Sequence, residues 1–187
     1  MPIVRIFDVS ISILILIILL PIMALISLLI LLIDGRPIIY KQLRVGYMGR
    51  QFTIFKFRTM SKHIFKNEEL RITKLGKILR KTSLDELPQF INVLKKDMSI
   101  VGPRPLPKSI EKKIDRSNKI KRRKILPGIT GMSQINYTGK KRKLIDKIEL
   151  DLQLVDSYSL PNYFKILFRT PIILFIRFFK NKSSIID

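Results

Sequence analysis

Two adjacent acids, Asp85 and Glu86, lie in the segment SLDELPQ of a strongly basic chain. An ionised aspartate is a competent nucleophile toward phosphorus, and a neighbouring glutamate can hold a divalent cation that neutralises the phosphate under attack. Mg²⁺ suits such a place, because it accepts carboxylate and phosphate oxygens together. The pair is therefore a candidate for phosphate chemistry, with Asp85 as the nucleophile and with both carboxylates as ligands of Mg²⁺.

The same residues also fit a structural role. Ser83 followed three residues later by Glu86 is a capping-box pattern. Pro88 argues against Ser83 as the N-cap, because the fifth helical position must donate a backbone N–H to the carbonyl of Leu84. With Asp85 as the N-cap, Pro88 takes the third position, so we expect a helix that begins at Asp85. Its positive end would favour the ionised carboxylate and attract phosphate.

Cations on either side of the acids strengthen the catalytic interpretation. In FKFRTM, Lys56 and Arg58 share one face if the segment is extended, and both are candidate phosphate ligands. In VGPRP, Arg104 stands between Pro103 and Pro105, which restrict the backbone around a guanidinium whose fork matches phosphate oxygens. A solvated basic face explains either group alone. Together with paired acids and an apolar segment, they indicate phosphate chemistry at a bilayer surface.

The composition limits the classes of protein that remain. The chain has 187 residues and a formal net charge of +22, which predicts a nucleic acid, a phosphate-bearing substrate or an acidic membrane surface as a partner. It has no cysteine, which excludes disulfides, thiolate catalysis and cysteine-ligated metals. A single histidine excludes a histidine-rich metal site. One domain with a modest core is expected.

The N-terminal segment 9–33 carries no charged residue and is long enough to cross a bilayer as a helix. Pro21, near its middle, removes a backbone hydrogen bond, so we expect a bend there. Arg5 before the segment and Arg36 after it prefer the same, cytoplasmic side. A re-entrant hairpin broken at Pro21 satisfies that preference, while a kinked spanning helix is the alternative. Residues 1–35 would form the hairpin and 36–187 a cytoplasmic, membrane-associated catalytic domain.

Short elements follow in the rest of the chain. Residues 38–60 alternate apolar and polar side chains around two glycines, which predicts two short strands. Residues 72–83 predict a short helix with a basic face, and 88–105 a helix that ends before a proline-rich turn. The fold class is therefore α+β and mostly helical.

The C-terminal half has a weaker pattern. Residues 111–124 predict a helix or a solvated linker, LPGITG at 126–131 a loop, and 142–158 an amphipathic helix. Residues 163–182 mix aromatic and aliphatic side chains with cations, which predicts an amphipathic helix at the membrane interface. A helix packed on the soluble core is the alternative.

Taken in order, these segments resemble the bacterial sugar transferases, the monotopic phosphoglycosyl transferases. The resemblance runs from about Arg5 to Lys180. It is carried by GRPIIYKQLRVG, FTIFKFRTM, ITKLGKILRKTSLDELPQFINVLKKDMSIVGPRP, PGITGMSQIN and IELDLQLV. The family's re-entrant helix also breaks at a proline, which favours the hairpin. Leu20 stands where the family usually has a serine before that proline, so the hydroxyl that could satisfy a freed carbonyl is missing.

The resemblance implies an enzyme that transfers a substituted phosphate group. A sugar 1-phosphate would pass from a UDP-sugar to undecaprenyl phosphate, releasing UMP, through a covalent phosphosugar on the nucleophile. This would be the first membrane step of glycoconjugate biosynthesis at the cytoplasmic face of the bacterial inner membrane. Downstream glycosyltransferases are further expected partners. The residues that match the family's nucleophile, its Mg²⁺-associated acid and its other active-site positions are Asp85, Glu86, Lys56, Arg104 and Asp151, with Arg80 and Gln134 as further substrate-binding candidates.

A membrane-anchored basic binding protein without catalysis is the competing interpretation. It explains the charge and the apolar segment, but it gives no reason for Asp85 and Glu86 to interrupt the basic field. The chain also lacks the aromatic-rich basic motifs of RNA-binding proteins, so nucleic acid is not an expected partner.

Overall fold

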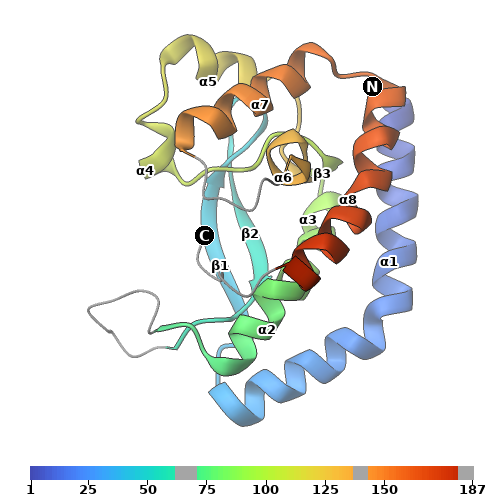
Figure 1. Cartoon of the computed structure of the whole chain (residues 1–187), viewed down its shortest axis with the longest axis vertical. Coiled ribbons are helices and arrows are strands. Elements are labelled where there is room, and N and C mark those ends of the chain that lie inside the picture. Colours follow the sequence, from blue (N-terminus) through green and yellow to red (C-terminus); the bar gives the residue numbers. More distant parts are fainter. Residues whose placement is uncertain (62–70, 137–142, 181–187) are drawn as a thin grey trace.

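The structure, a computed structural model, describes residues 1–61, 71–136 and 143–180 (Figure 1). In these ranges the protein is mostly helical, with two small two-stranded sheets. The predicted class, α+β and mostly helical, is confirmed.

The N-terminal helix α1 (Pro2–Leu29) continues without interruption into a π-helical turn, η1 (Ile30–Asp34). By length and composition this helix could cross a membrane, and most of its side chains are exposed. Figure 1 shows α1 bent into two arms, the second of which runs along the base of the molecule. Pro21 lies inside the helix, and a proline there produces such a bend.

The first turns of α1 are tied to the rest of the protein. The Arg5 guanidinium donates to the carbonyl of Val93 at 2.6 Å. The buried carboxylate of Asp8 accepts from the backbone N–H of Ile100 and from the hydroxyl of Tyr163, each at 2.8 Å. Burial raises the pKa of Asp8, although these hydrogen bonds oppose the shift. A carboxylate held in this way fixes the start of α1 against the folded domain.

The other end of the helix is also tied down. The hydroxyl of Thr73 donates to the Asp34 carboxylate at 2.9 Å. The buried Arg58 guanidinium donates to the backbone carbonyls of Asp34 and Gly35. A cation at the carbonyl end of a helix satisfies acceptors that have no partner within the helix. Arg58 therefore binds the end of this N-terminal helix.

Strands β1 (Ile39–Val45) and β2 (Gln51–Phe57) form an antiparallel hairpin around the 3-10 turn η2 (Tyr47–Gly49), as predicted. Successive side chains of β2 point to opposite faces. The outer edge of β2 is closed by a side chain of α3 (Gln89–Leu94): Asn92 accepts from the N–H of Phe55 at 3.0 Å and donates to the carbonyl of Thr53 at 2.7 Å.

The segment that holds the two acids differs from the prediction. Helix α2 (Lys74–Thr82) ends at Ser83, whose φ of 57° is left-handed, and the 3-10 turn η4 (Leu84–Glu86) follows before α3 begins at Gln89. The prediction that Asp85 is the N-cap of a helix is therefore wrong. Neither does the Ser83 side chain make a capping bond. The left-handed residue reverses the chain, so a tight turn holds Asp85 between two helices.

A second sheet joins β3 (Ser99–Val101) to β4 (Gly128–Thr130) in parallel. The prediction of a plain loop at LPGITG is wrong, because a three-residue strand depends on a partner far away in sequence. Gly128 lies so close to the chain after β3 that a Cβ there would sit 2.0 Å from the backbone nitrogen of Gly102. Between these strands lie α4 (Lys108–Glu111) and α5 (Arg116–Arg122), and α6 (Met132–Ile135) follows.

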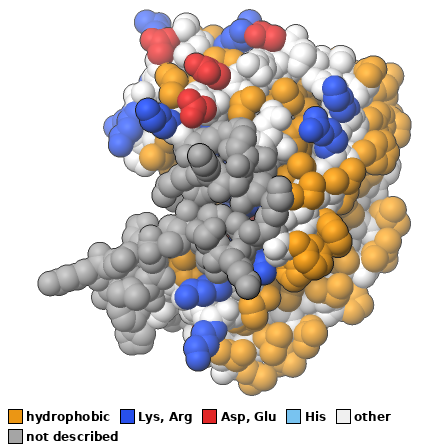
Figure 2. Space-filling model, in the orientation of Figure 1, with side chains coloured by type: hydrophobic (Ala, Val, Ile, Leu, Met, Phe, Trp, Pro, Cys, Tyr) orange, Lys and Arg blue, Asp and Glu red, His pale blue; other side chains and the backbone are white. Residues whose placement is uncertain are grey.

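Helices α7 (Leu144–Asp156) and α8 (Leu160–Lys180) complete the described fold. The amphipathic helix predicted over α7 is confirmed. In α8 the first turns pack into the core through Tyr163 and Ile166, whereas Phe168, Phe175 and Phe179 are exposed farther along. Hydrophobic side chains cover the side of the molecule along which α1 and α8 lie (Figure 2).

Candidate active site

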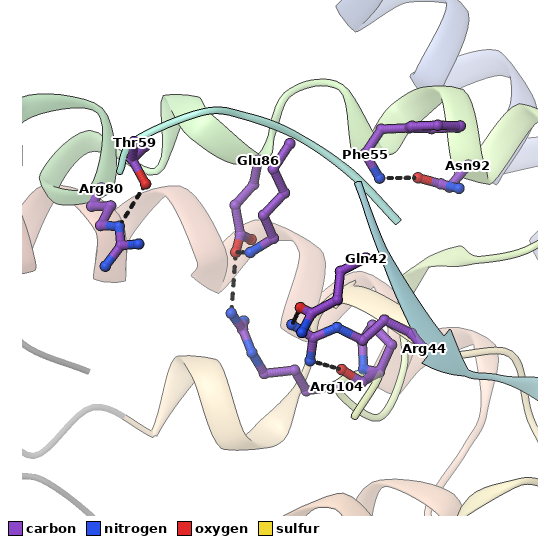
Figure 3. A network of polar contacts seen from close by, with 10 residues as sticks. Gln42, Arg44, Phe55, Thr59, Arg80, Glu86, Asn92 and Arg104 are labelled. Carbon is purple, nitrogen blue, oxygen red and sulfur yellow. Dashed lines mark hydrogen bonds and ion pairs between the residues drawn. The ribbon is translucent and has the colours of Figure 1, made fainter. Parts of the chain in front are cut away.

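The centre of the site is the carboxylate of Glu86 in the turn η4. Its oxygen Oε1 lies 2.5 Å from the Lys56 ammonium of β2 and 3.1 Å from the Arg104 guanidinium, which follows β3 (Figure 3). The side chains of Lys56 and Glu86 are only 16% and 18% exposed. Three separate elements therefore bring an acid and two cations together, and charge-assisted bonds of this kind are strong.

Asp85 is buried beside this group, with 8% of its surface exposed. Burial, reinforced by the negative charge of Glu86, raises the pKa of Asp85 to about 6, while the charges of Lys56, Arg80 and Arg104 oppose the rise. Burial alone would also raise the pKa of Glu86, but the charges and hydrogen bonds of Arg104 and Lys56 outweigh it and lower that pKa to about 2. Their surroundings therefore move the pKa values of the two acids in opposite directions, as is typical of sites in which two carboxylates have different roles.

The backbone that carries Arg104 is held at every carbonyl from Pro103 to Leu106. Such support adds to the restriction that the flanking prolines impose. The backbone of this segment is therefore fixed, and the side chain of Arg104 is the part that can still change its conformation. The donors, in order of the carbonyls they bind, are Gly128 N at 2.9 Å, Arg122 Nη2 at 2.8 Å, Arg44 Nη1 at 3.1 Å and Val45 N at 3.0 Å.

Asp151 reaches the site through a second residue. It forms a deeply buried ion pair with Arg122, whose Nη2 lies 2.7 Å from Oδ2 of Asp151 and also donates to the carbonyl of Arg104. Burial raises the pKa of Asp151, and the charge of Arg122 opposes the shift. Asp151 therefore acts in this structure by fixing Arg122, which in turn positions Arg104.

The remaining candidates are placed differently. Arg80 lies close enough for its charge to act on Asp85, and its Nε donates to the Thr59 hydroxyl at 2.8 Å (Figure 3). Gln134, in α6, accepts a hydrogen bond from the neighbouring Ser133. The structure brings Lys56, Arg80 and Arg104 around the acids. It does not bring Arg58 there, because that guanidinium binds the end of η1.

Comparison with known proteins decides the family. The sequence model of one family, bacterial sugar transferase, matches residues 1–177. The chain belongs to the bacterial sugar transferase family. The resemblance inferred from the motifs is thereby confirmed.

Individual sugar transferases are also similar. The uncharacterized sugar transferase EpsL of Bacillus subtilis (strain 168) is 45% identical over 138 residues, which cover 67% of this chain and 63% of that protein. The UDP-glucose:undecaprenyl-phosphate glucose-1-phosphate transferase of Klebsiella pneumoniae is 38% identical over 195 residues, covering 96% of this chain and 41% of that protein.

A third relative is named for a different sugar. The UDP-N-acetylgalactosamine-undecaprenyl-phosphate N-acetylgalactosaminephosphotransferase of Aeromonas hydrophila is 36% identical over 161 residues, covering 80% of this chain and 38% of that protein. The chain therefore spans less than two thirds of the length of each of these three relatives.

Two arginines of this sugar transferase were missed by reasoning from the sequence. Arg44 supports the carbonyl of Pro105, and Arg122 supports that of Arg104. Arg122 belongs to the run KIKRRK, whose other members look equally solvated in sequence. Only the packing of α5 against α7 distinguishes it, because that contact buries its side chain beside Asp151.

Proposed function

We propose that this sugar transferase moves a sugar 1-phosphate from a UDP-sugar to undecaprenyl phosphate and releases UMP. The observation that carries this proposal is the buried Asp85, adjacent to a Glu86 carboxylate whose charge is balanced by Lys56 and Arg104. A binding protein without catalysis would need no buried acid with a raised pKa among phosphate-binding cations. Two of the relatives are named for this type of reaction.

In the first step, a carboxylate oxygen of Asp85 attacks the phosphorus that bears the sugar. The bond between that phosphorus and the bridging oxygen breaks, and UMP leaves with the electron pair. An acyl-phosphate then links the sugar phosphate to Asp85. Arg104 and Arg80, whose charges act on Asp85, would offset the charge that gathers on the phosphate oxygens and the leaving group.

In the second step, an oxygen of undecaprenyl phosphate attacks the same phosphorus. The bond from phosphorus to the Asp85 oxygen breaks, which restores the carboxylate and gives a diphosphate-linked lipid. The low pKa of Glu86 keeps that acid charged throughout, so it holds Lys56 and Arg104 in place over both steps.

The two carboxylates fit Mg²⁺. Both cations contact Oε1 of Glu86, and no donor reaches its Oε2 within the described ranges. No group of three or more metal-binding side chains gathers in those ranges, so a cation held by Asp85 and Glu86 would complete its shell with phosphate oxygens. When bound, Mg²⁺ would neutralise phosphate charge.

Both ends of the continuous helix formed by α1 and η1 support a re-entrant helix. Asp8 at the start and Asp34 at the end bind the same folded domain, while one face of the middle of the helix is exposed. A spanning helix would carry its two ends to opposite sides of the bilayer, where one domain could not hold both. We therefore propose that the domain and the N-terminus lie on the same side of the membrane, and the strong positive charge of the chain favours the cytoplasmic side.

The natural absence of cysteine allows a clean test of this topology. A cysteine added before Met1 should resist a membrane-impermeant thiol reagent in intact cells and react after lysis. A cysteine at the exposed Lys112 should behave in the same way. Labelling of the N-terminal cysteine in intact cells would establish a spanning helix instead.

The reaction itself is tested by UMP release. The purified chain in detergent would be incubated with Mg²⁺, undecaprenyl phosphate and a panel of UDP-sugars that includes UDP-glucose and UDP-N-acetylgalactosamine. We expect release with at least one sugar, dependent on the lipid for turnover. Asp85→Asn should be inactive, whereas the control Asp156→Asn, at an exposed acid, should be active. Equal activity of Asp85→Asn would contradict the proposal.

A further inference from the structure

A cavity of about 650 Å³ lies on the face of the β1–β2 hairpin that points away from Lys56 and the candidate active site. It is lined by Lys41 and Phe55, which are paired across the two strands. The small cavity beside Glu86 is lined instead by Ile54 and Lys56. Because neighbouring side chains of a strand point to opposite faces, the hairpin separates the two cavities.

The walls of the larger cavity are mostly apolar, and they begin at the membrane helix. Leu31, in the last turn of that helix, lines it together with Ile39 of β1 and Ile91 of α3. Ile91 is 41% exposed, so the cavity is open beside α3. Its volume falls in the range of roughly 300–1,000 Å³ that is usual for ligand sites. The cavity is therefore large enough and open enough to take an apolar chain.

Three cations line the same cavity: Arg36, Lys41 and Lys95. The ammonium groups of Lys41 and Lys95 lie 6.0 Å and 5.3 Å from the centre of the Phe55 ring, so both cations border the same aromatic wall of the cavity. None of the described residues that line the cavity is acidic. Apolar walls that lead from a membrane helix to grouped cations are complementary to a lipid with a charged phosphate head.

We infer that this cavity binds one anionic membrane phospholipid, with an acyl chain against Leu31 and Ile91 and its phosphate between Lys41 and Lys95. The occupant is a phospholipid and not the acceptor lipid, because neither Asp85 nor Glu86 lines this cavity, which lies on the other face of the hairpin from the cavity beside Glu86. The bound lipid would join the membrane helix to the hairpin that carries Lys56. The proposed ligand comes from a bilayer, but its binding does not depend on the proposed sugar phosphate transfer.

Lipid retention by the full chain tests the inference without any turnover. Native mass spectrometry would measure binding of phosphatidylglycerol and phosphatidylcholine to the wild type and to three variants. A lysine near a membrane phosphate contributes on the order of 1 kcal/mol, so Lys41→Ala/Lys95→Ala should bind phosphatidylglycerol about 30-fold more weakly. Ile91→Trp, at an exposed position, should fill the opening and weaken binding of either lipid.

The matched control is Lys112→Ala/Lys113→Ala, which removes the same charge from two exposed lysines outside the cavity. We expect wild-type binding of phosphatidylglycerol by this variant and preference for that lipid over phosphatidylcholine in the wild type. Equal losses in both double-lysine variants would overturn the inference. Displacement of phosphatidylglycerol by equimolar undecaprenyl phosphate would also overturn the inference, because the cavity would then be a binding site for the acceptor lipid.

Discussion

Replacing Asp85 by asparagine should stabilise the folded protein at neutral pH. Burial and the charge of Glu86 raise the pKa of Asp85 from 3.8 to about 6 in the folded state. In the unfolded chain the same group titrates near its usual pKa of about 3.9. The folded state therefore binds the proton more tightly, and stability falls as the pH rises between roughly 4 and 6.

The size of this effect follows from the shift. A difference of about two pH units corresponds to about 3 kcal/mol of folding free energy, fully lost above the folded-state pKa. Only 8% of the residue is exposed, so solvent screening reduces this little. Because asparagine cannot ionise, the Asp85→Asn protein does not lose this folding free energy as the pH rises. For a chain of this size, about 3 kcal/mol raises the Tm by roughly 6–12 °C.

The assay is thermal unfolding in detergent with a metal chelator, at about pH 4 and about pH 8, which bracket the titration. We expect Asp85→Asn to melt higher than the wild type at the upper pH and close to it at the lower. The control Asp156→Asn, at an exposed acid, should show no such gain. An Asp85→Asn protein that melts no higher than the wild type at the upper pH, or a gain that is the same at both, would refute the reasoning.

Two other carboxylates give separate tests. Glu86→Gln keeps the size of the side chain but removes its charge, so Mg²⁺-dependent UMP release should fall by about 100-fold, whereas Glu149→Gln at an exposed position should be unaffected. Asp151→Asn leaves the buried Arg122 without its counter-charge and should lower the free energy of unfolding by about 3–5 kcal/mol, read from the shift of the denaturation midpoint. Unchanged activity in the first case, or an unchanged midpoint in the second, would contradict these roles.

Local patterns predicted the elements that carry the site. The alternation over residues 38–60 predicted the hairpin, and the helical period of 142–158 predicted α7, because one face of each packs on the core. Lys56 was found because a cation on an extended segment matches phosphate, and Arg104 because, in addition, its flanking prolines restrict the backbone. The structure brings both to Glu86.

Features that depend on distant contacts were not predictable in this way. Ser83 takes a left-handed conformation that no local sequence pattern predicted. The helix therefore begins at Gln89 and not at Asp85, where it was expected. Strand β4 exists through its pairing with β3. Arg58 matched the same chemical criteria as Lys56, yet it binds the end of η1, a partner that sequence spacing does not reveal.

The covalent route through Asp85 is tested most directly by the intact mass of the protein. The purified chain would be incubated with Mg²⁺ and the UDP-sugar that supports UMP release, without undecaprenyl phosphate. We predict a mass gain of one phosphosugar in the wild type, its loss on addition of the lipid, and no gain in Asp85→Asn. Lipid-dependent turnover with no adduct, or an adduct that persists in Asp85→Asn, would contradict the assignment of Asp85 as the nucleophile.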